Sequence, residues 1–177
     1  ERCSAGTAVQ VVANVPYYIT TPLIRRFLDD ALPVENITVL VQKEVADRMT
    51  AVPGTKTYGA LSVLLALYGK AKKAFAVPRT SFLPPPKVDS AVVHLKKEPL
   101  GGLSAAEREA VNAIVRQAFL ERRKMVKKAL VRSTGADAQA MEKFLVLRGL
   151  PSTARAENLS PQDFVALWQT FGYKVNR

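Results

Sequence analysis

The segment Val9-Gln10-Val11-Val12-Ala13 leads directly into Asn14-Val15-Pro16-Tyr17. Its run of apolar residues is typical of a buried strand. Proline fixes its own φ and biases the preceding Val15 toward extended backbone, so we expect an open loop before the next helix. The sequence therefore predicts a strand whose end presents an amide, a backbone carbonyl and an aromatic ring.

These groups suit a flat ring that carries an exocyclic amine, and adenine fits best. The Asn14 side-chain oxygen and the Pro16 carbonyl would each accept a hydrogen bond from N6, which draws the nitrogen toward tetrahedral geometry and exposes its lone pair. Tyr17 would stack on the base, a contact worth about 1–3 kcal/mol. Acceptors fixed before the substrate arrives provide electrostatic preorganisation. The same tetrapeptide is also typical of an ordinary strand-to-helix turn.

Composition narrows the class of protein. The 177 residues carry a net charge of +11, with a pI near 10.0, which favours a polyanionic partner. The apolar run near Leu61–Tyr68 is too short to span a bilayer. The single cysteine, Cys3, allows no internal disulfide and has no metal-binding companions. The only histidine, His94, alternates with apolar neighbours, as a structural residue in a strand does. We expect a cytoplasmic protein without a metal and without a membrane segment.

Strands and helices alternate in the first part of the chain. Strands are predicted over 9–13 and 37–41, and helices over 21–31, 44–50 and 58–69. This order is typical of an α/β protein with parallel strands. Two further strands, predicted over 71–77 and 88–96, have no helix between them, so we expect them to pair antiparallel at the sheet edge.

Only helices are predicted after 99–102. Ser104 and Glu107 have the spacing of a capping box, and Ser160 precedes Pro161 as a helix N-cap does. We therefore divide the chain into an α/β part, 1–98, and a helical part, 99–177. No glycine-rich phosphate loop is found in the sequence.

Four motifs, in this order, resemble the KsgA-type small-subunit (16S) rRNA adenine N6-dimethyltransferase family. They are Asn14–Pro22, Gln42–Arg48, Pro78–Ser90 and Arg122–Lys124. The resemblance implies the second half of a Rossmann-like class I methyltransferase sheet, parallel strands plus an antiparallel edge hairpin, followed by a small all-α domain. It also implies a catalytic site at Asn14, Pro16 and Tyr17, with Phe82 as a second aromatic face. Taken alone, Phe82 before three prolines is equally typical of a core plug.

The resemblance implies S-adenosyl-L-methionine as cofactor. The family builds that site from a glycine-rich loop and acidic strand ends that are absent from this sequence, so Asn14 is the only cofactor contact we expect here. We expect that the chain lacks the N-terminal cofactor-binding part, binds the cofactor poorly and is inactive alone. Its exposed strand 9–13 is then expected to favour self-association.

Two groups of basic residues suit an RNA partner, because lysine and arginine neutralise phosphates without reading sequence. Lys70, Lys72, Lys73 and Arg79 lie near the expected adenine site. The larger group contains Arg116, Arg122, Arg123, Lys124, Lys127, Lys128 and Arg132. The alternative is that these residues form a solvated surface.

The resemblance implies dimethylation of two adjacent adenines in a small-subunit rRNA hairpin, with a role in ribosome biogenesis. The alternative is a non-catalytic module that binds rRNA or immature small subunits. Large-subunit relatives share the Asn-x-Pro-Tyr site, but 82–90 and Asn158–Phe164 resemble the small-subunit enzymes more.

Overall fold

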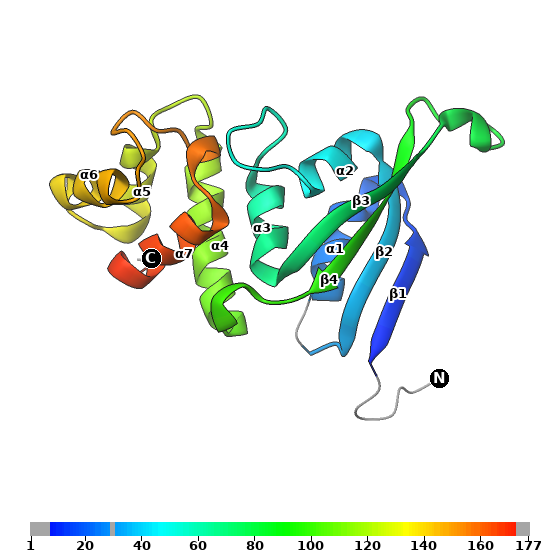
Figure 1. The fold of residues 1–177 in the computed structure, drawn as a ribbon, viewed down its shortest axis with the longest axis horizontal. Coiled ribbons are helices and arrows are strands. Elements are labelled where there is room, and N and C mark those ends of the chain that lie inside the picture. The colour runs from blue at the N-terminus through cyan, green and yellow to red at the C-terminus, as the bar shows by residue number, and fades with distance from the viewer. Residues whose placement is uncertain (1–7, 29–30, 173–177) are drawn as a thin grey trace. The chain divides into compact units, whose positions relative to one another are not determined.

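The computed structural model of the protein describes residues 8–28 and 31–172, so Cys3 lies outside the described residues (Figure 1). The described chain forms two compact units. The first holds the residues up to Thr50 together with Tyr68–Pro99, and the second holds Ala51–Leu67 and the residues from Leu100 onward. The sequence placed 51–67 with the sheet, whereas in the structure these residues group with the helices. The packing of Tyr58, whose ring contacts Phe119, contributes to this grouping.

The first unit is built on a four-stranded sheet. Its strands are β1 (Val9–Asn14), β2 (Val34–Gln42), β3 (Gly69–Val77) and β4 (Ser90–Lys97), in the order β1-β2-β4-β3. β1 and β2 are parallel, and β4 pairs antiparallel with both β2 and β3. The predicted antiparallel pair is confirmed, and β4 takes the inner position.

Burial explains why β4 rather than β3 lies inside the sheet. Ala91, Val93 and Leu95 of β4 are fully buried, whereas most of β3 is exposed. An apolar strand gains more from two neighbours and a covered face than a lysine-rich strand does. The lysine-rich β3 is therefore left at the edge, where charged side chains also oppose pairing with another chain.

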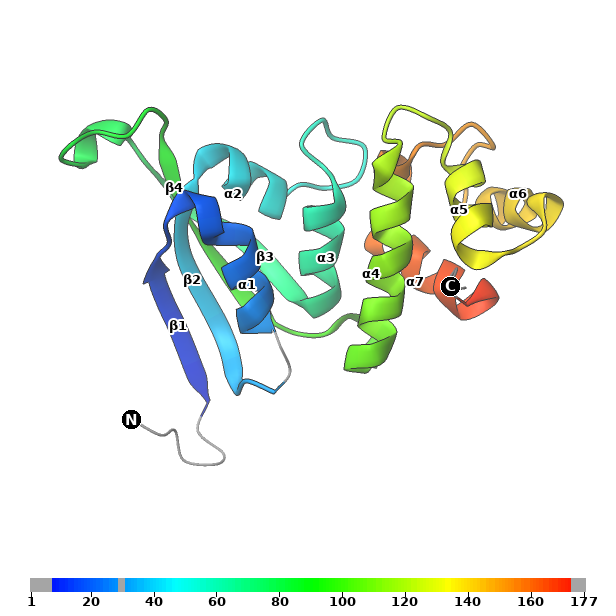
Figure 2. The same cartoon turned by 180° about the vertical axis from the view of Figure 1, so that it is seen from behind.

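Helices α1 (Thr20–Leu28) and α2 (Lys43–Met49) cover one face of this sheet (Figures 1 and 2). On β2, Ile37, Val39 and Val41 are buried beneath them and alternate with half-buried residues. Within the described residues, the other face is open, and Val12 on β1 is 79% exposed there. α1 begins at Thr20, one residue earlier than predicted, so Pro22 is its third residue.

The second unit contains the remaining helices. They are α3 (Ala60–Tyr68), α4 (Ala105–Leu120), α5 (Val126–Thr134), α6 (Ala138–Leu147) and α7 (Pro161–Phe171). The predicted capping box of Ser104 and Glu107 is confirmed, and so is the Ser160 cap of α7. A row of rings, Tyr58, Phe119 and Phe164, runs through the core of the unit with centroids 6.1 and 6.2 Å apart.

No helix among the described residues is long and apolar enough to cross a membrane. No group of His, Cys, Asp or Glu among them is placed to hold a metal ion.

Candidate functional site

A pocket of about 230 Å³ lies at the end of β1. Its lining comes from two segments that are far apart in the sequence, and consists of Asn14, Val15, Pro16, Tyr17, Phe82, Pro84 and Pro86. Asn14 is the last residue of β1, Tyr17 opens a short 3-10 helix, and Phe82 follows another one, Arg79–Ser81. The structure thus brings together all four residues that the sequence proposed as catalytic.

Asn14 is exposed at the mouth of this pocket. Among the described residues, no hydrogen bond engages its side chain, which leaves the amide oxygen available to a ligand. An asparagine side chain supplies one acceptor oxygen and two N–H donors. Its position is fixed by the parallel pairing of β1, in which Asn14 lies opposite Leu40 of β2.

The carbonyl of Pro16 is already engaged in the turn that starts α1. It accepts the Ile19 N–H at 3.1 Å and the Thr20 hydroxyl at 3.3 Å. A backbone carbonyl has two lone pairs, so these two donors occupy both. The sequence interpretation that Pro16 accepts N6 is therefore corrected: the proline shapes the loop, and its own carbonyl holds the first turn of the helix.

Val15 supplies the next backbone carbonyl toward the strand. The residue lines the pocket although its side chain is only 2% exposed. Within the described part of the chain, no hydrogen bond reaches its carbonyl. The Val15 carbonyl is therefore available to accept a hydrogen bond from a ligand beside Asn14, whereas the Pro16 carbonyl is engaged. The sequence alone does not show this difference.

The Tyr17 side chain is fixed through its hydroxyl, which lies 2.8 Å from the Ser90 Oγ. Ser90 is the first residue of β4 and is fully buried. Sequence analysis did not single out Ser90. Its contact with Tyr17 arises from sheet pairing, which sets β4 beside β2, and no local pattern around Ser90 indicates it.

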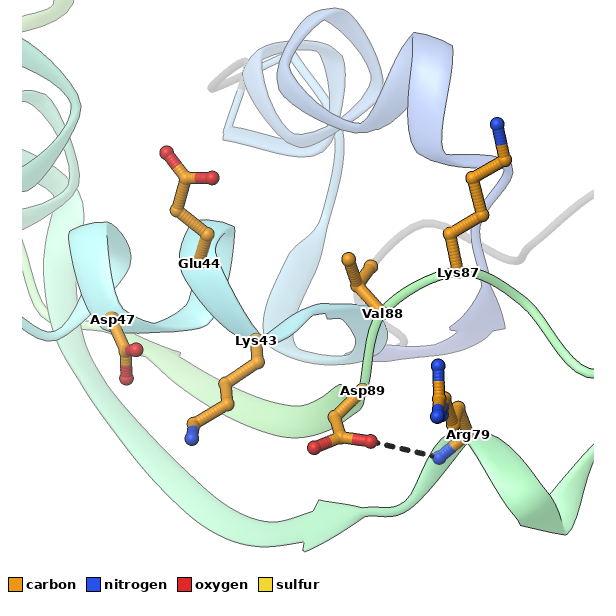
Figure 3. A pocket seen from close by; sticks show the side chains of 7 residues that line it. All are labelled: Lys43, Glu44, Asp47, Arg79, Lys87, Val88 and Asp89. Atoms are coloured by element: carbon orange, nitrogen blue, oxygen red, sulfur yellow. Dashed lines mark hydrogen bonds between the residues drawn. The ribbon is translucent and has the colours of Figure 1, made fainter.

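Phe82 lies on the loop that joins β3 to β4. The Arg79 N–H donates to the Asp89 carboxylate at 3.0 Å across the base of this loop, as Figure 3 shows. Inside the loop, the Phe82 N–H donates to the Arg79 carbonyl at 3.3 Å. The half-buried Phe82 ring is thus attached to the sheet through a short series of hydrogen bonds that ends at Asp89.

A second pocket, of about 610 Å³, lies beside that loop base. Its lining residues are Lys43, Glu44, Asp47, Arg79, Lys87, Val88 and Asp89 (Figure 3). In Figure 3 the side chains of Lys43 and Lys87 point in opposite directions. The cations therefore do not converge on one point, and carboxylates are interleaved with them, so this pocket is not built for a single phosphate.

The family model for ribosomal RNA adenine dimethylases matches residues 1–171. The chain belongs to the ribosomal RNA adenine dimethylase family. Among curated proteins, it is 39% identical over 170 residues to the ribosomal RNA small subunit methyltransferase A of Geobacillus sp. (strain WCH70) and 38% identical to that of Bacillus mycoides (strain KBAB4). The matches cover 94% of the chain but 58% of each relative's length.

Two solved structures extend this likeness to the fold. A crystal structure of the 23S rRNA methyltransferase ErmE superposes with a TM-score of 0.71 at 25% identity, covering 92% of this chain and 64% of that one. A dimethyladenosine transferase from Plasmodium falciparum gives 0.72 at 26% identity, covering 93% and 68%. The fold class inferred from the sequence is confirmed.

The family implies S-adenosylmethionine, but the residues that line the pocket do not by themselves form a site for it. The pocket at Asn14 is lined otherwise by apolar and aromatic residues and contains no acidic side chain that could hold a ribose. Asn14 alone does not make a cofactor site.

The structure separates the basic residues of the helical unit into two kinds. Of the seven residues in the larger predicted basic group, four form ion pairs, which are Arg116 with Glu109, Arg122 with Glu157, Lys127 with Glu142 and Arg132 with Glu121. Arg123, Lys124 and Lys128 are exposed and have no ion-pair partner in the described part of the chain. These three, called the free cations below, are the ones best able to meet phosphates.

The predicted basic group near the pocket is also partly neutralised. Lys70 pairs with Glu98 at 2.8 Å, and Lys73 pairs with Asp47. Hydrogen bonds from Lys70 and Lys96 lower the pKa of Glu98 to about 2. Lys72 and the side chain of Arg79 form no ion pair with any described residue and remain available.

Proposed function

We propose that the protein containing this chain transfers methyl groups from S-adenosylmethionine to N6 of two adjacent adenines in a hairpin of small-subunit rRNA. The observation that carries the proposal is the single pocket that unites Asn14, Tyr17 and Phe82. It has the groups that a flat base with an exocyclic amine requires. The relatives named small subunit methyltransferase support the substrate class.

Two acceptors hold the amine in this proposal. The Asn14 side-chain oxygen and the Val15 carbonyl each accept one N6–H bond, because the Pro16 carbonyl is already engaged. This draws N6 toward tetrahedral geometry and turns its lone pair outward. The cofactor supplies the methyl group. The methylated nitrogen becomes acidic and loses its proton to water, so no general base is required.

The second methylation uses the same groups. After the first transfer one N–H remains on N6, and one acceptor suffices to hold it. Tyr17 and Phe82 keep their stacking contacts with the ring, each worth about 1–3 kcal/mol, and these contacts do not depend on the methylation state. The same pocket can therefore serve both steps.

The base reaches the pocket only by leaving its stack, as in other enzymes that modify nucleobases. The free cations are proposed to contact rRNA phosphates while this happens, with Lys72 and Arg79 closer to the pocket. Phosphate contacts supply affinity that depends on salt and not on sequence. We place the protein in the cytoplasm, where it acts on immature small subunits.

The direct test is Asn14→Ala in the complete protein. Removing an acceptor that acts in the transition state costs about 100- to 1,000-fold in rate, so methyl transfer to small-subunit RNA should fall by that factor while RNA affinity stays near wild type. Gln10→Ala is the matched control, since Gln10 is exposed on the same strand and the same face. Methyl incorporation by Asn14→Ala at the wild-type rate would remove this residue from the mechanism.

A second candidate is a non-catalytic module that docks on rRNA. It is favoured by the free cations and by the incomplete cofactor site of the described residues. Calorimetry with S-adenosylmethionine separates the two: a methyltransferase binds the cofactor, and a docking module need not. For the 177-residue chain alone we expect weak cofactor binding and no methyl transfer.

The choice between small-subunit and large-subunit RNA is supported by the degree of identity. The small-subunit relatives are 38–39% identical, and the large-subunit enzyme of known structure is 25% identical. Methylation assays on the two RNAs side by side test this choice. Preferential labelling of large-subunit RNA would contradict it.

A further inference from the structure

Two consecutive residues, Asp89 and Ser90, contact both halves of the pocket. Ser90 reaches Tyr17 through its hydroxyl, and Asp89 reaches the loop of Phe82 through its carboxylate. They stand where that loop enters β4, at the point where Ser90 pairs with Val77 of β3 and Gln42 of β2. Both aromatic walls of the pocket are thus tied to one dipeptide in the sheet.

The Ser90 contact is built into the sheet. Its side chain is fully buried, and its Oγ lies 2.8 Å from the Tyr17 hydroxyl, a normal distance for a hydrogen bond between hydroxyls. A buried hydroxyl without a partner costs free energy, so this bond restricts the positions that the Tyr17 ring can take. The ring is fixed at its far end as well as at its backbone.

The Asp89 contact acts on the other wall. Its carboxylate accepts the Arg79 N–H at 3.0 Å, which places the 3-10 turn whose next residue is Phe82 (Figure 3). Its carbonyl accepts the Lys43 N–H at 3.0 Å, which ties the same residue to the start of α2. Asp89 therefore holds the base of the Phe82 loop to the body of the unit.

We propose that Asp89 and Ser90 are positioning residues that align the Tyr17 and Phe82 rings for stacking on the two faces of the target adenine. The inference rests on the proposed function of the pocket. It assigns a role to two residues that do not line the pocket themselves. A sub-ångström error in ring placement weakens stacking and moves N6 away from its acceptors, which slows transfer more than it weakens RNA binding.

The test compares Ser90→Ala, Tyr17→Phe and the double variant in the complete protein. Each single change removes one end of the same hydrogen bond, and we expect each to lower the single-turnover rate by about 5- to 10-fold. The double variant should be no slower than the slower single variant, because the second change removes nothing further. RNA affinity should be unchanged. Losses that multiply in the double variant would overturn the proposal for Ser90.

Thr38→Ala is the matched control. Its hydroxyl forms another cross-strand hydrogen bond in the same sheet, 2.9 Å from the His94 Nδ1, and it does not line the pocket. We expect this variant to lose thermal stability and to keep its rate. If Ser90→Ala behaves in the same way, Ser90 is structural and the proposal fails.

Asp89 is tested by a rescue pair. Asp89→Ala removes the acceptor for the Arg79 N–H, whereas Asp89→Asn retains an oxygen there. We expect the alanine variant to slow transfer and the asparagine variant to restore most of the rate. Equal losses in both would contradict positioning through this bond.

A fluorescence measurement separates this inference from the proposed function. RNA with 2-aminopurine at the target position reports stacking directly, since stacked 2-aminopurine is quenched. We expect less quenching with Ser90→Ala and Asp89→Ala than with wild type. If Asn14→Ala keeps full activity, the proposed function fails; if Asn14→Ala is inactive but quenching and rate are normal in the Asp89 and Ser90 variants, only this inference fails.

Discussion

The Tyr58 hydroxyl donates a 2.8 Å hydrogen bond to the carbonyl of Leu159, which lies 101 positions further along the chain. The Tyr58 side chain is fully buried, and its ring meets that of Phe119 edge-on. Burial and, to a lesser extent, the charge of Asp163 raise the pKa of this hydroxyl, so it remains a donor at all physiological pH values. This bond is one of the contacts that join residues 51–67 to the helices.

Tyr58→Phe should therefore destabilise the helical unit. The change leaves the Leu159 carbonyl buried without its donor, at a cost of about 1–3 kcal/mol in the free energy of unfolding. Urea denaturation followed by circular dichroism measures this. Tyr18→Phe is the control, since Tyr18 is 89% exposed and should lose nothing. Equal stabilities of the two variants would contradict the role of the bond.

Replacing the free cations Arg123, Lys124 and Lys128 by alanine should weaken rRNA binding. Each lost phosphate contact flattens the dependence of log K on log salt by about 0.7–0.9. Filter binding at several salt concentrations gives the slope. The matched triple change is Arg116, Lys127 and Arg132 to alanine, whose charges are already paired in the structure. If the salt dependence of log K flattens equally in the two triple variants, ion pairing does not decide which of these residues contact phosphates.

Arg122→Ala should affect stability more than RNA binding. The Arg122 guanidinium donates to Glu157 at 3.1 Å and to the Lys56 carbonyl at 2.6 Å, and so holds the loop before α3 to the helical unit. Loss of both bonds at this partly exposed position should cost about 1 kcal/mol in the free energy of unfolding. Arg123→Ala, at the neighbouring free cation, should leave stability unchanged. If Arg123→Ala lowers the free energy of unfolding and Arg122→Ala does not, the structural role belongs to Arg123 and this prediction is wrong.

Acid should weaken the contacts of Glu98. Lys70 and Lys96 lower the pKa of its carboxyl from the ordinary 4.5 to about 2. Because the pKa is lower in the folded state, this stabilisation is present above about pH 4.5 and is lost as the pH falls toward 2. Carbon-13 NMR of the Glu98 carboxyl measures the titration, and Lys70→Met should raise its midpoint. A wild-type midpoint at the ordinary value would contradict the contact.

The β1 edge should promote self-association of the 177-residue chain. Within the described residues β1 pairs only with β2, and its Val12 side chain is largely exposed. Val12→Lys should reduce association in sedimentation velocity, because lysine on an edge strand opposes pairing with another chain. Val52→Lys is the control, since Val52 is 60% exposed but lies in the helical unit. A monomer at all concentrations would show that this edge does not drive association.

Sequence patterns were sufficient for features that are local in the chain. The βαβ order, the antiparallel pair and the caps at Ser104 and Ser160 depend on neighbouring residues and were predicted. Asn14, Pro16 and Tyr17 follow from the chemistry of the residues themselves and Phe82 from the motif resemblance, and the structure brings the four together. The inner place of β4 was not predicted, because it depends on which strand buries more apolar surface against β2.

The contacts that sequence analysis missed are set by tertiary structure. The Ser90 partner of Tyr17 depends on strand pairing, and the packing of Tyr58 depends on how distant helices meet. The Pro16 carbonyl was assigned to N6 because the sequence does not show that the Ile19 N–H and the Thr20 hydroxyl reach it first. The sequence likewise does not show which basic residues of the helical unit form ion pairs and which are the free cations.

The bond between Tyr17 and Ser90 spans 73 positions, and it joins the loop after β1 to β4, the first and last strands among the described residues. Closing so long a loop is slow compared with forming a helix, because chain entropy is lost before distant contacts compensate for it. During synthesis, Tyr17 leaves the ribosome well before Ser90. A nascent chain therefore carries an unfinished pocket until β4 has emerged and inserted beside β2.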